Sequence, residues 1–181
     1  MNKKTAKLNS SGKPAIFLDR DGTINYDYGY VHKFSNLKFR PKVLKGMRYL
    51  TKKKYLIFIV TNQAGVAKGK FKLLDLITLH KQMKAYLKKR KIYVNDIEYC
   101  PYHPYGIIKR YKKKSEFRKP GNFMIKKILK KWDINLKKSF MLGDQKSDAL
   151  AAKKSGLYFE FVEFNFYKQI KKIEKKIINN Y

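Results

Sequence analysis

The sequence predicts an α/β fold, a Rossmann-like doubly wound parallel sheet with helices on both faces. Two observations predict it. Short apolar runs alternate along the 181 residues with stretches whose apolar residues recur at helical spacing. The run LIFIV at 56–60 consists only of large apolar residues, as expected of a strand buried on both faces. Repeated strand–helix units form parallel sheets, and ligands bind beyond the carboxyl ends of their strands.

Five strands and five helices are expected in alternation. The strands are predicted from their apolar runs at 15–18, 56–60, 97–100, 140–142 and 157–162. Helices are predicted from apolar stripes at 43–50, 76–87, 124–132 and 166–177, and from a segment that Ser147 can cap and Gly156 can close. The third stripe includes Trp132, and residues 101–121 are expected to be irregular.

One domain is expected over residues 14–181. Residues 1–13 are basic and run into Ser and Gly, so they are predicted to be a flexible lead-in rather than a secretion signal. We find neither an internal repeat nor a domain-sized linker, so no large cap domain is expected. No stretch approaches the roughly 18–20 apolar residues that a membrane helix needs. The sequence therefore predicts a cytoplasmic protein without membrane insertion.

The composition is strongly basic. Lys and Arg number 44 and Asp and Glu 13, which gives a net charge of +31. Such a charge favours polyanionic partners, but the lysines are spread over every predicted helix, which favours a general compositional bias instead. The single cysteine, Cys100, excludes an internal disulfide and an all-cysteine metal site. His80 falls on the apolar stripe of its helix and is expected to be packed there.

Acidic residues follow two of the predicted strands. Asp19 and Asp21 are two residues apart, so in extended backbone their side chains leave the same face, and Gly22 then lets the chain turn. Asp144 follows the strand at 140–142. Asp148 lies one helical turn further on, where it can support a metal ligand or pair with the N-terminus of its helix. Crowded carboxylates are costly unless a proton or a cation neutralises them. Ligands that are all oxygen predict Mg²⁺ at this edge of the sheet.

Two other segments carry groups that can hold an anion. Thr61 and Asn62 follow the strand at 56–60, and Arg118 and Lys119 lie in the irregular segment, where functional residues concentrate. A nucleophilic carboxylate, a divalent cation and several donors together describe phosphoryl transfer.

Four motifs in order give the chain a family resemblance. DRDGT, TNQAG, RKP and GDQKSD resemble the motifs of the haloacid dehalogenase superfamily of phosphohydrolases. The stretches PAIFLDRDGTIN, GYVH, VTNQAGVAKGKF and YCPYHP resemble one branch, the D-glycero-D-manno-heptose 1,7-bisphosphate phosphatases and the related histidinol-phosphate phosphatases. The resemblance covers roughly residues 14–157.

The resemblance implies a role for each site residue. Asp19 is the nucleophile, and Asp21 is the general acid and base. Thr61 and Lys119 hold the phosphoryl oxygens, with support from substrate-binding Asn62 and Arg118. Mg²⁺ is bound by Asp19, Asp144 and the backbone carbonyl of Asp21. The sugar side is expected to be lined by Asp27, Gly29 and Tyr30 of the DYGY stretch.

The chain departs from the branch in a loop that carries a structural zinc in many of its members. Of the zinc ligands only Cys100 is matched: Tyr102 stands at the histidine position, and Ser115 and Phe117 replace two later cysteines. With His103 nearby, two ligands do not complete a tetrahedral site. The sequence therefore predicts no bound zinc, with Tyr102 and Phe117 holding the loop by packing. A second departure is Gln145, where lysine is frequent in the branch.

The predicted function is that of a magnesium-dependent phosphomonoesterase acting through an aspartyl-phosphate. A monomer acting on a small phosphorylated sugar is expected, namely heptose bisphosphate in the synthesis of lipopolysaccharide or other surface glycans. Two alternatives stay open: a histidinol-phosphate phosphatase, and a basic nucleic-acid-binding protein or DNA 3′-phosphatase. No specific nucleic acid is expected, because the aromatic residues fall mainly at predicted core positions rather than on a stacking surface.

Overall fold

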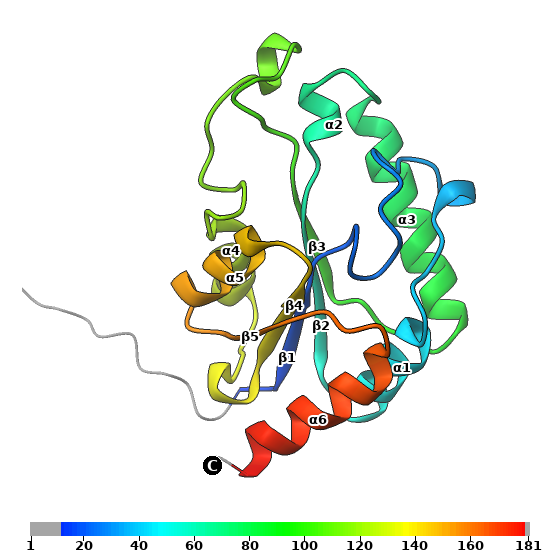
Figure 1. Ribbon diagram of the computed structural model, residues 1–181, viewed down its shortest axis with the longest axis vertical. Coiled ribbons are helices and arrows are strands. Elements are labelled where there is room, and N and C mark those ends of the chain that lie inside the picture. The colour runs from blue at the N-terminus through cyan, green and yellow to red at the C-terminus, as the bar shows by residue number, and fades with distance from the viewer. Residues whose placement is uncertain (1–11, 180–181) are drawn as a thin grey trace, which may run out of the picture.

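A computed structural model describes residues 12–179 and contains one five-stranded parallel sheet with helices on both faces (Figure 1). Every neighbouring pair of strands is parallel. Their order in the sheet is β3-β2-β1-β4-β5. The predicted doubly wound fold is confirmed. The strands are β1 (Ala15–Leu18), β2 (Leu56–Asn62), β3 (Asp96–Cys100), β4 (Phe140–Gly143) and β5 (Tyr158–Phe161).

The helices divide between the two faces of the sheet (Figure 1). One face is covered by α1 (Val43–Lys52), α3 (Leu73–Lys89) and α6 (Phe166–Asn179). The other face is covered by α4 (Phe123–Lys131) and α5 (Lys146–Lys154). The short α2 follows β2 directly, and single 3-10 turns lie in the connections. These are α2 (Ala64–Ala67), η1 (Phe34–Asn36), η2 (Lys109–Tyr111) and η3 (Leu136–Lys138).

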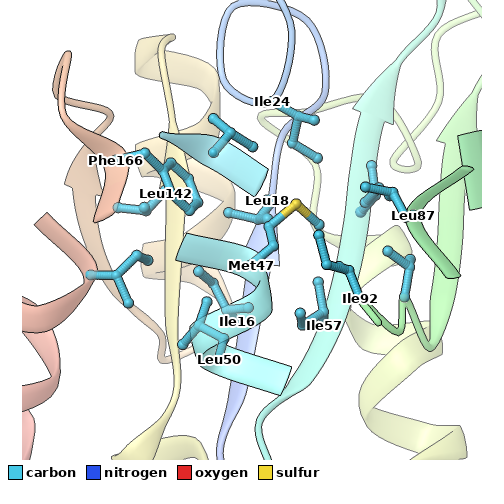
Figure 2. Close-up of a cluster of buried hydrophobic side chains, with 14 of the residues drawn as sticks. Ile16, Leu18, Ile24, Met47, Leu50, Ile57, Leu87, Ile92, Leu142 and Phe166 are labelled. Carbon is cyan, nitrogen blue, oxygen red and sulfur yellow. The ribbon is translucent and has the colours of Figure 1, made fainter. Parts of the chain in front are cut away.

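Strand alternation builds both halves of the core. In β1, Ile16 and Leu18 point to the cluster under α1, α3 and α6, while Ala15 and Phe17 point to the cluster under α4 and α5. Figure 2 shows the first cluster, in which Met47 of α1 lies over the strands. All four β1 side chains are fully buried, and burying one large aliphatic side chain contributes about 1.5–3 kcal/mol. The central strand is therefore held rigidly from both sides.

The ends of two helices differ from the sequence prediction. α5 begins at Lys146 with Gln145 as its N-cap, so the prediction that Ser147 caps this helix is wrong. The reason is that the Gln145 backbone N–H donates to the Asp148 carboxylate (3.0 Å), the reciprocal half of a capping box. α4 ends at Lys131, and Trp132 lies just beyond it, packed edge-on against Phe58.

The N-terminal boundary also lies earlier than predicted. Residues 1–11 of the predicted flexible lead-in lie outside the described residues. Lys13, which the prediction included in the lead-in, pairs with Ile134: its N–H donates to the Asp133 carbonyl (3.2 Å), and its carbonyl accepts from the Asn135 N–H (2.9 Å). Lys13 is therefore part of the fold.

The strand order creates a crevice beside β1. The chain adds β2 and β3 on one side of β1 and then crosses over to add β4 and β5 on the other, which makes β1–β4 the topological switch point. At its carboxyl end, the Asp19 N–H donates to the Leu142 carbonyl (3.0 Å), which ties the two strand ends together. Ligands of open α/β sheets bind at such points.

Candidate active site

A cavity of about 540 Å³ opens at the carboxyl ends of the strands. The structure brings all ten predicted site residues to its lining. They are Asp19, Asp21, Asp27, Gly29, Tyr30, Thr61, Asn62, Arg118, Lys119 and Asp144. Asp148 and Gln145 line it as well, together with Gln63 and Ser147, which no prediction assigned to substrate or metal.

Three carboxylates converge at one edge of the cavity. Asp19, Asp144 and Asp148 each offer one oxygen, and these oxygens lie within 4.8 Å of one another. The backbone makes room for them with glycine. A Cβ on Gly22 would lie 2.2 Å from an Asp144 oxygen, and a Cβ on Gly143 would lie 2.4 Å from an Asp148 oxygen. Only residues without side chains at these two positions allow the carboxylates to gather.

Lys119 joins two of the acids. Its Nζ lies 2.6 Å from Asp19 Oδ1 and 2.6 Å from Asp148 Oδ1, and it donates to the Val60 carbonyl (2.8 Å). The side chain is buried, at 4% exposure. Burial lowers the pKa of Lys119, but the attraction of Asp19 and Asp148 outweighs it, so the pKa is raised overall. Lys119 is therefore a fixed cation inside the acidic cluster.

One cation does not neutralise the cluster. Burial, opposed by Lys119 and reinforced by Asp148, raises the pKa of Asp19 to about 7. Burial also raises the pKa of Asp144, whose buried Oδ1 has no hydrogen-bond partner among the described residues. The site therefore offers three oxygen ligands, an excess of negative charge, and an Asp144 oxygen without a hydrogen-bond donor among the described residues. This combination fits a hard divalent cation such as Mg²⁺.

Asp21 lies beside this cluster in a separate hydrogen-bonded setting. The Arg20 guanidinium donates from Nε to Asp21 Oδ1 (3.1 Å) and from Nη2 to Oδ2 (2.7 Å). Asn25 Nδ2 and Gln63 Nε2 donate to the same carboxylate at 2.9 and 2.8 Å. Four donor atoms from three side chains thus fix the orientation of Asp21.

Arg20 is itself enclosed. It is fully buried, and it also donates to the Val31 carbonyl (2.8 Å) and lies 3.1 Å from His80 Nε2. Burial, and then the charge of Arg20, lowers the pKa of His80 to about 3. A neutral His80 accepts a hydrogen bond from Arg20 Nη1. His80 is packed against its neighbours as predicted, and it is in addition a partner of the arginine.

Sequence reasoning missed Arg20, Asn25, Gln63 and His80 as parts of the site. One feature of the sequence could have indicated this network: Arg20 is a single cation between two acids at the end of a buried strand. Asp148 was predicted to support a ligand or to pair with a helix N-terminus, and in the structure its two oxygens face different partners. Oδ2 accepts from the Gln145 N–H at the start of α5, while Oδ1 pairs with Lys119.

Hydrogen-bond donors line the cavity as well. Gln63 Nε2 donates to Thr61 Oγ1 (2.9 Å), which leaves the hydroxyl proton free to donate into the cavity. Asn62 holds the Lys119 backbone from both sides, donating to its carbonyl (3.1 Å) and accepting from its N–H (3.0 Å). Arg118 Nη1 is buried without a hydrogen-bond partner among the described residues.

The loop after β1 forms the rim. Gly29 has φ +80°, and its N–H donates to the Asp27 carboxylate (2.9 Å). Tyr30 is 40% exposed and lines the cavity, and its carbonyl lies 2.8 Å from His32 Nδ1. The His32 ring stacks on Phe71, with ring centroids 5.0 Å apart. This rim is open to solvent and polar.

The loop between β3 and α4 is held by aromatic packing. Tyr102 and Phe117 pack against the core cluster under α4 and α5, as predicted. The Phe117 ring meets Phe123 edge-on, with centroids 5.8 Å apart. Cys100 is fully buried, and burial raises the pKa of its thiol. The absence of zinc stays a prediction.

Comparison with known proteins assigns the fold to a family. A profile of the family described as polynucleotide kinase 3 phosphatase matches residues 17–176. The chain belongs to the haloacid-dehalogenase-like phosphatases. This phosphatase is 40% identical, over 80% of its chain, to the D-glycero-beta-D-manno-heptose-1,7-bisphosphate 7-phosphatase of Rhodopseudomonas palustris, 81% of which is covered. It is 41% identical, over 77% of its chain, to the protein of the same name in Escherichia coli K12, 73% of which is covered.

Solved structures share the architecture of this phosphatase. A Mesorhizobium loti protein assigned as a HAD-like phosphatase superposes with a TM-score of 0.81 at 25% identity, covering 91% of this chain and 87% of its own. D,D-heptose 1,7-bisphosphate phosphatase from B. bronchiseptica, complexed with magnesium and phosphate, has a TM-score of 0.77 at 23% identity, covering 93% and 99%. Within residues 12–179, every helix is too short or too polar to cross a bilayer.

Proposed function

We propose that this phosphatase is a magnesium-dependent phosphomonoesterase that removes the 7-phosphate from D-glycero-D-manno-heptose 1,7-bisphosphate. The observation that carries the proposal is the convergence of Asp19, Asp144 and Asp148 around one point, beside Lys119 and at the switch point of the sheet. The substrate is taken from the relatives of about 40% identity, whose printed names specify this sugar and this position. The expected pathway is the synthesis of heptose units for lipopolysaccharide or other surface glycans.

Asp19 is proposed as the nucleophile. A carboxylate oxygen of Asp19 forms a bond to phosphorus while the bond from phosphorus to the sugar oxygen breaks, which leaves an aspartyl-phosphate. Lys119 holds Asp19 Oδ1 at 2.6 Å and is itself held by Val60 and Asn62, so the attacking group stays in one orientation. Fixed geometry of this kind lowers the entropic cost of in-line attack.

Asp21 is proposed as the proton carrier. In its acid form it donates a proton to the departing sugar oxygen, and as the carboxylate it then takes one from the water that hydrolyses the aspartyl-phosphate. Proton transfer by a positioned side chain contributes about 10²–10⁴-fold. The hydrogen bonds from Arg20, Asn25 and Gln63 support this role, because they aim the carboxyl group at the cavity.

Asp19, Asp144 and the backbone carbonyl of Asp21 are proposed to hold Mg²⁺. Asp148 supports the site from the third corner of the acidic cluster. When bound, Mg²⁺ supplies positive charge that offsets the charge building up on the phosphoryl oxygens. The free Thr61 hydroxyl proton and Lys119 are proposed to bind those oxygens, with support from Asn62 and the buried Nη1 of Arg118. Asp27, Gly29 and Tyr30 would then contact the sugar.

A panel of substrates tests the proposal. Phosphate release is measured with Mg²⁺ from heptose 1,7-bisphosphate, histidinol phosphate, a 3′-phosphorylated oligonucleotide and p-nitrophenyl phosphate. Heptose bisphosphate is expected to give the highest kcat/KM, and the product is expected to retain the 1-phosphate. Asp19→Asn should lower kcat by more than about 10⁴-fold with every substrate. An Asp19→Asn variant with wild-type activity would exclude the aspartyl-phosphate mechanism.

One alternative has an observation in its favour. The matching family is described as polynucleotide kinase 3 phosphatase, and the net charge of +31 attracts nucleic acid. Against this alternative stands the open rim at Asp27 and Tyr30, where the cavity is lined by a carboxylate rather than by a basic groove. Faster turnover of the 3′-phosphorylated oligonucleotide than of any sugar phosphate would favour the alternative and reject the heptose proposal.

A further inference from the structure

A basic and apolar projection lies outside the active site. We define it as the η2 tip, residues 105–114, which read YGIIKRYKKK. It stands out from the end of the molecule that also carries α2 (Figure 1). Its apolar side chains face water: Tyr105 is 83% exposed, Ile107 76% and Ile108 38%. Large apolar side chains grouped on a surface indicate an interaction site more often than single exposed ones do.

The fold holds these side chains outward. The N–H groups of Ile107 and Ile108 both donate to the Ala67 carbonyl, at 2.8 and 3.0 Å. Gly106 lies so close to α2 that a Cβ there would be 2.8 Å from that of Ala67. The Tyr111 N–H donates back to the Ile108 carbonyl (2.9 Å) and closes the turn. The exposure of the apolar residues is therefore built into a hydrogen-bonded turn rather than caused by a loose loop.

Cations that make no ion pair among the described residues follow the apolar residues in the chain. Five of the six residues from 109 to 114 are basic, and all five are exposed. None of them makes an ion pair within residues 12–179. The contact with α2 brings Lys68 and Lys70 to the same end of the molecule. The five basic residues are Lys109, Arg110, Lys112, Lys113 and Lys114.

We propose that the η2 tip docks on the surface of an anionic lipid bilayer. Ile107 and Tyr105 would enter the boundary between headgroups and acyl chains, and the five cations would pair with headgroup phosphates. The partner needs both negative charge and apolar depth, which a bilayer surface combines. Nucleic acid supplies the negative charge, but an exposed isoleucine adds little affinity for it. Proteins that bind single-stranded nucleic acid stack the bases on aromatic side chains instead. This inference does not depend on which phosphate ester the enzyme hydrolyses.

Vesicle sedimentation tests the proposal with the full chain. Vesicles contain phosphatidylcholine with about one third phosphatidylglycerol, and pure phosphatidylcholine vesicles provide the reference. Binding is expected only to the anionic vesicles and is expected to weaken with salt. Ile107→Ser is expected to reduce the partition coefficient about tenfold, since the apolar contact is lost. Changing the five cations to glutamine is expected to reduce it by at least about 100-fold.

A matched control separates the η2 tip from the general charge of the protein. It replaces five exposed lysines of α1, its C-cap position and α3 with glutamine, for the same change in net charge. These are Lys52, Lys53, Lys81, Lys88 and Lys89. The control is expected to bind anionic vesicles within about threefold of wild type, with the charge near the tip unchanged. Phosphatase activity on p-nitrophenyl phosphate shows that each variant is folded.

Three results would overturn the docking proposal. The first is a control variant that loses as much vesicle binding as the tip variant, which would mean that vesicle binding depends only on the net charge of the protein. The second is an Ile107→Ser variant with unchanged vesicle binding. The third is an η2 tip that contributes more to binding a single-stranded oligonucleotide than to binding vesicles, which would make nucleic acid the partner instead.

Discussion

The guanidinium of Arg20 donates to both carboxylate oxygens of Asp21 while it is fully buried between β1, the rim loop and α3. This pair differs from a surface ion pair, because Arg20 has no access to water and all its contacts come from the protein. The remaining nitrogen of the guanidinium, Nη1, lies within hydrogen-bond distance of the His80 ring. A helix on one face of the sheet therefore helps to position the proposed proton carrier at the end of the central strand.

The neutral state of His80 predicts a pH dependence of stability. In the folded protein burial lowers its pKa to about 3 from 6.5, so between these values the unfolded chain binds a proton that the folded chain does not. Stability contributed by neutral His80 is complete above about pH 6.5 and is lost as the pH falls toward 3. The free energy of unfolding, measured with urea between pH 4 and 7, should fall more steeply for wild type than for His80→Gln.

Glutamine is the matched variant because its side-chain oxygen can accept from Arg20. His80→Gln is expected to keep kcat within about threefold of wild type, while His80→Phe leaves the buried Arg20 Nη1 unpaired and should lower both stability and kcat. Parallel pH slopes for wild type and His80→Gln would show that His80 does not titrate as described.

Lys119 is predicted to be the main electrostatic support of the cluster. Lys119→Met leaves Asp19 and Asp148 buried beside each other without a counter-charge, so the free energy of unfolding at pH 8 should fall by about 3–5 kcal/mol. Because a divalent cation can replace part of the lost charge, added Mg²⁺ should raise the Tm of Lys119→Met more than that of wild type.

Lys127→Met is the control for this prediction. Lys127 pairs with Glu98 on the surface with its side chain 59% exposed, and such pairs are worth at most about 1 kcal/mol. Equal decreases in the free energy of unfolding of the two variants would mean that burial does not increase the contribution of Lys119 to stability.

Asp144 is predicted to decide the affinity for Mg²⁺. Asp144→Asn removes one charge from the cluster, so the Mg²⁺ concentration at half-maximal activity should rise at least about 100-fold. The Tm without Mg²⁺ should be unchanged or higher, because the repulsion among the three acids decreases, and the rise of Tm on adding Mg²⁺ should disappear. Glu163→Gln, at an exposed site outside the cavity, should leave all three values unchanged. A normal Mg²⁺ response of Asp144→Asn would remove Asp144 from the metal site.

Phe117 is predicted to hold the β3–α4 loop over the cavity. Phe117→Ala removes packing against the core cluster and the contact with Phe123, so the free energy of unfolding should fall by about 1–3 kcal/mol. The same loop carries Arg118 and Lys119, so KM for the phosphate ester should rise. Phe117→Leu keeps most of the volume and should lie near wild type, and thermal scans with and without a zinc chelator should coincide for all three proteins. A drop in Tm on chelation would contradict the prediction of no zinc.

The sheet and the ends of its strands could be predicted because they depend on local pattern. The runs at 15–18, 56–60 and 140–142 are apolar without interruption, and parallel strands place their carboxyl ends together, so Asp19, Thr61 and Asp144 had to meet at one edge. The charge of Arg118 and Lys119 and their irregular segment indicated that both can hold an anion, but their specific roles came from the family motif.

The network behind Asp21 could not be predicted because it joins positions far apart in the chain. Arg20 and His80 meet only because α3 packs on the face of the sheet next to the end of β1. No sequence periodicity predicts the hydrogen bond between them. The N-cap of α5 was predicted wrongly for a local reason. Gln145 and Ser147 are both polar, but only Gln145 has an acid three residues later to bind its backbone N–H.

The close contacts of Gly22 with Asp144 and of Gly143 with Asp148 limit the positions at which this enzyme can be redesigned. Because any side chain there would collide with Asp144 or Asp148, mutant libraries aimed at new substrates should leave both positions fixed. Asp27 and Tyr30 on the solvent-facing rim have room to vary. Selectivity could therefore be evolved at the entrance while the phosphoryl-transfer chemistry is left intact.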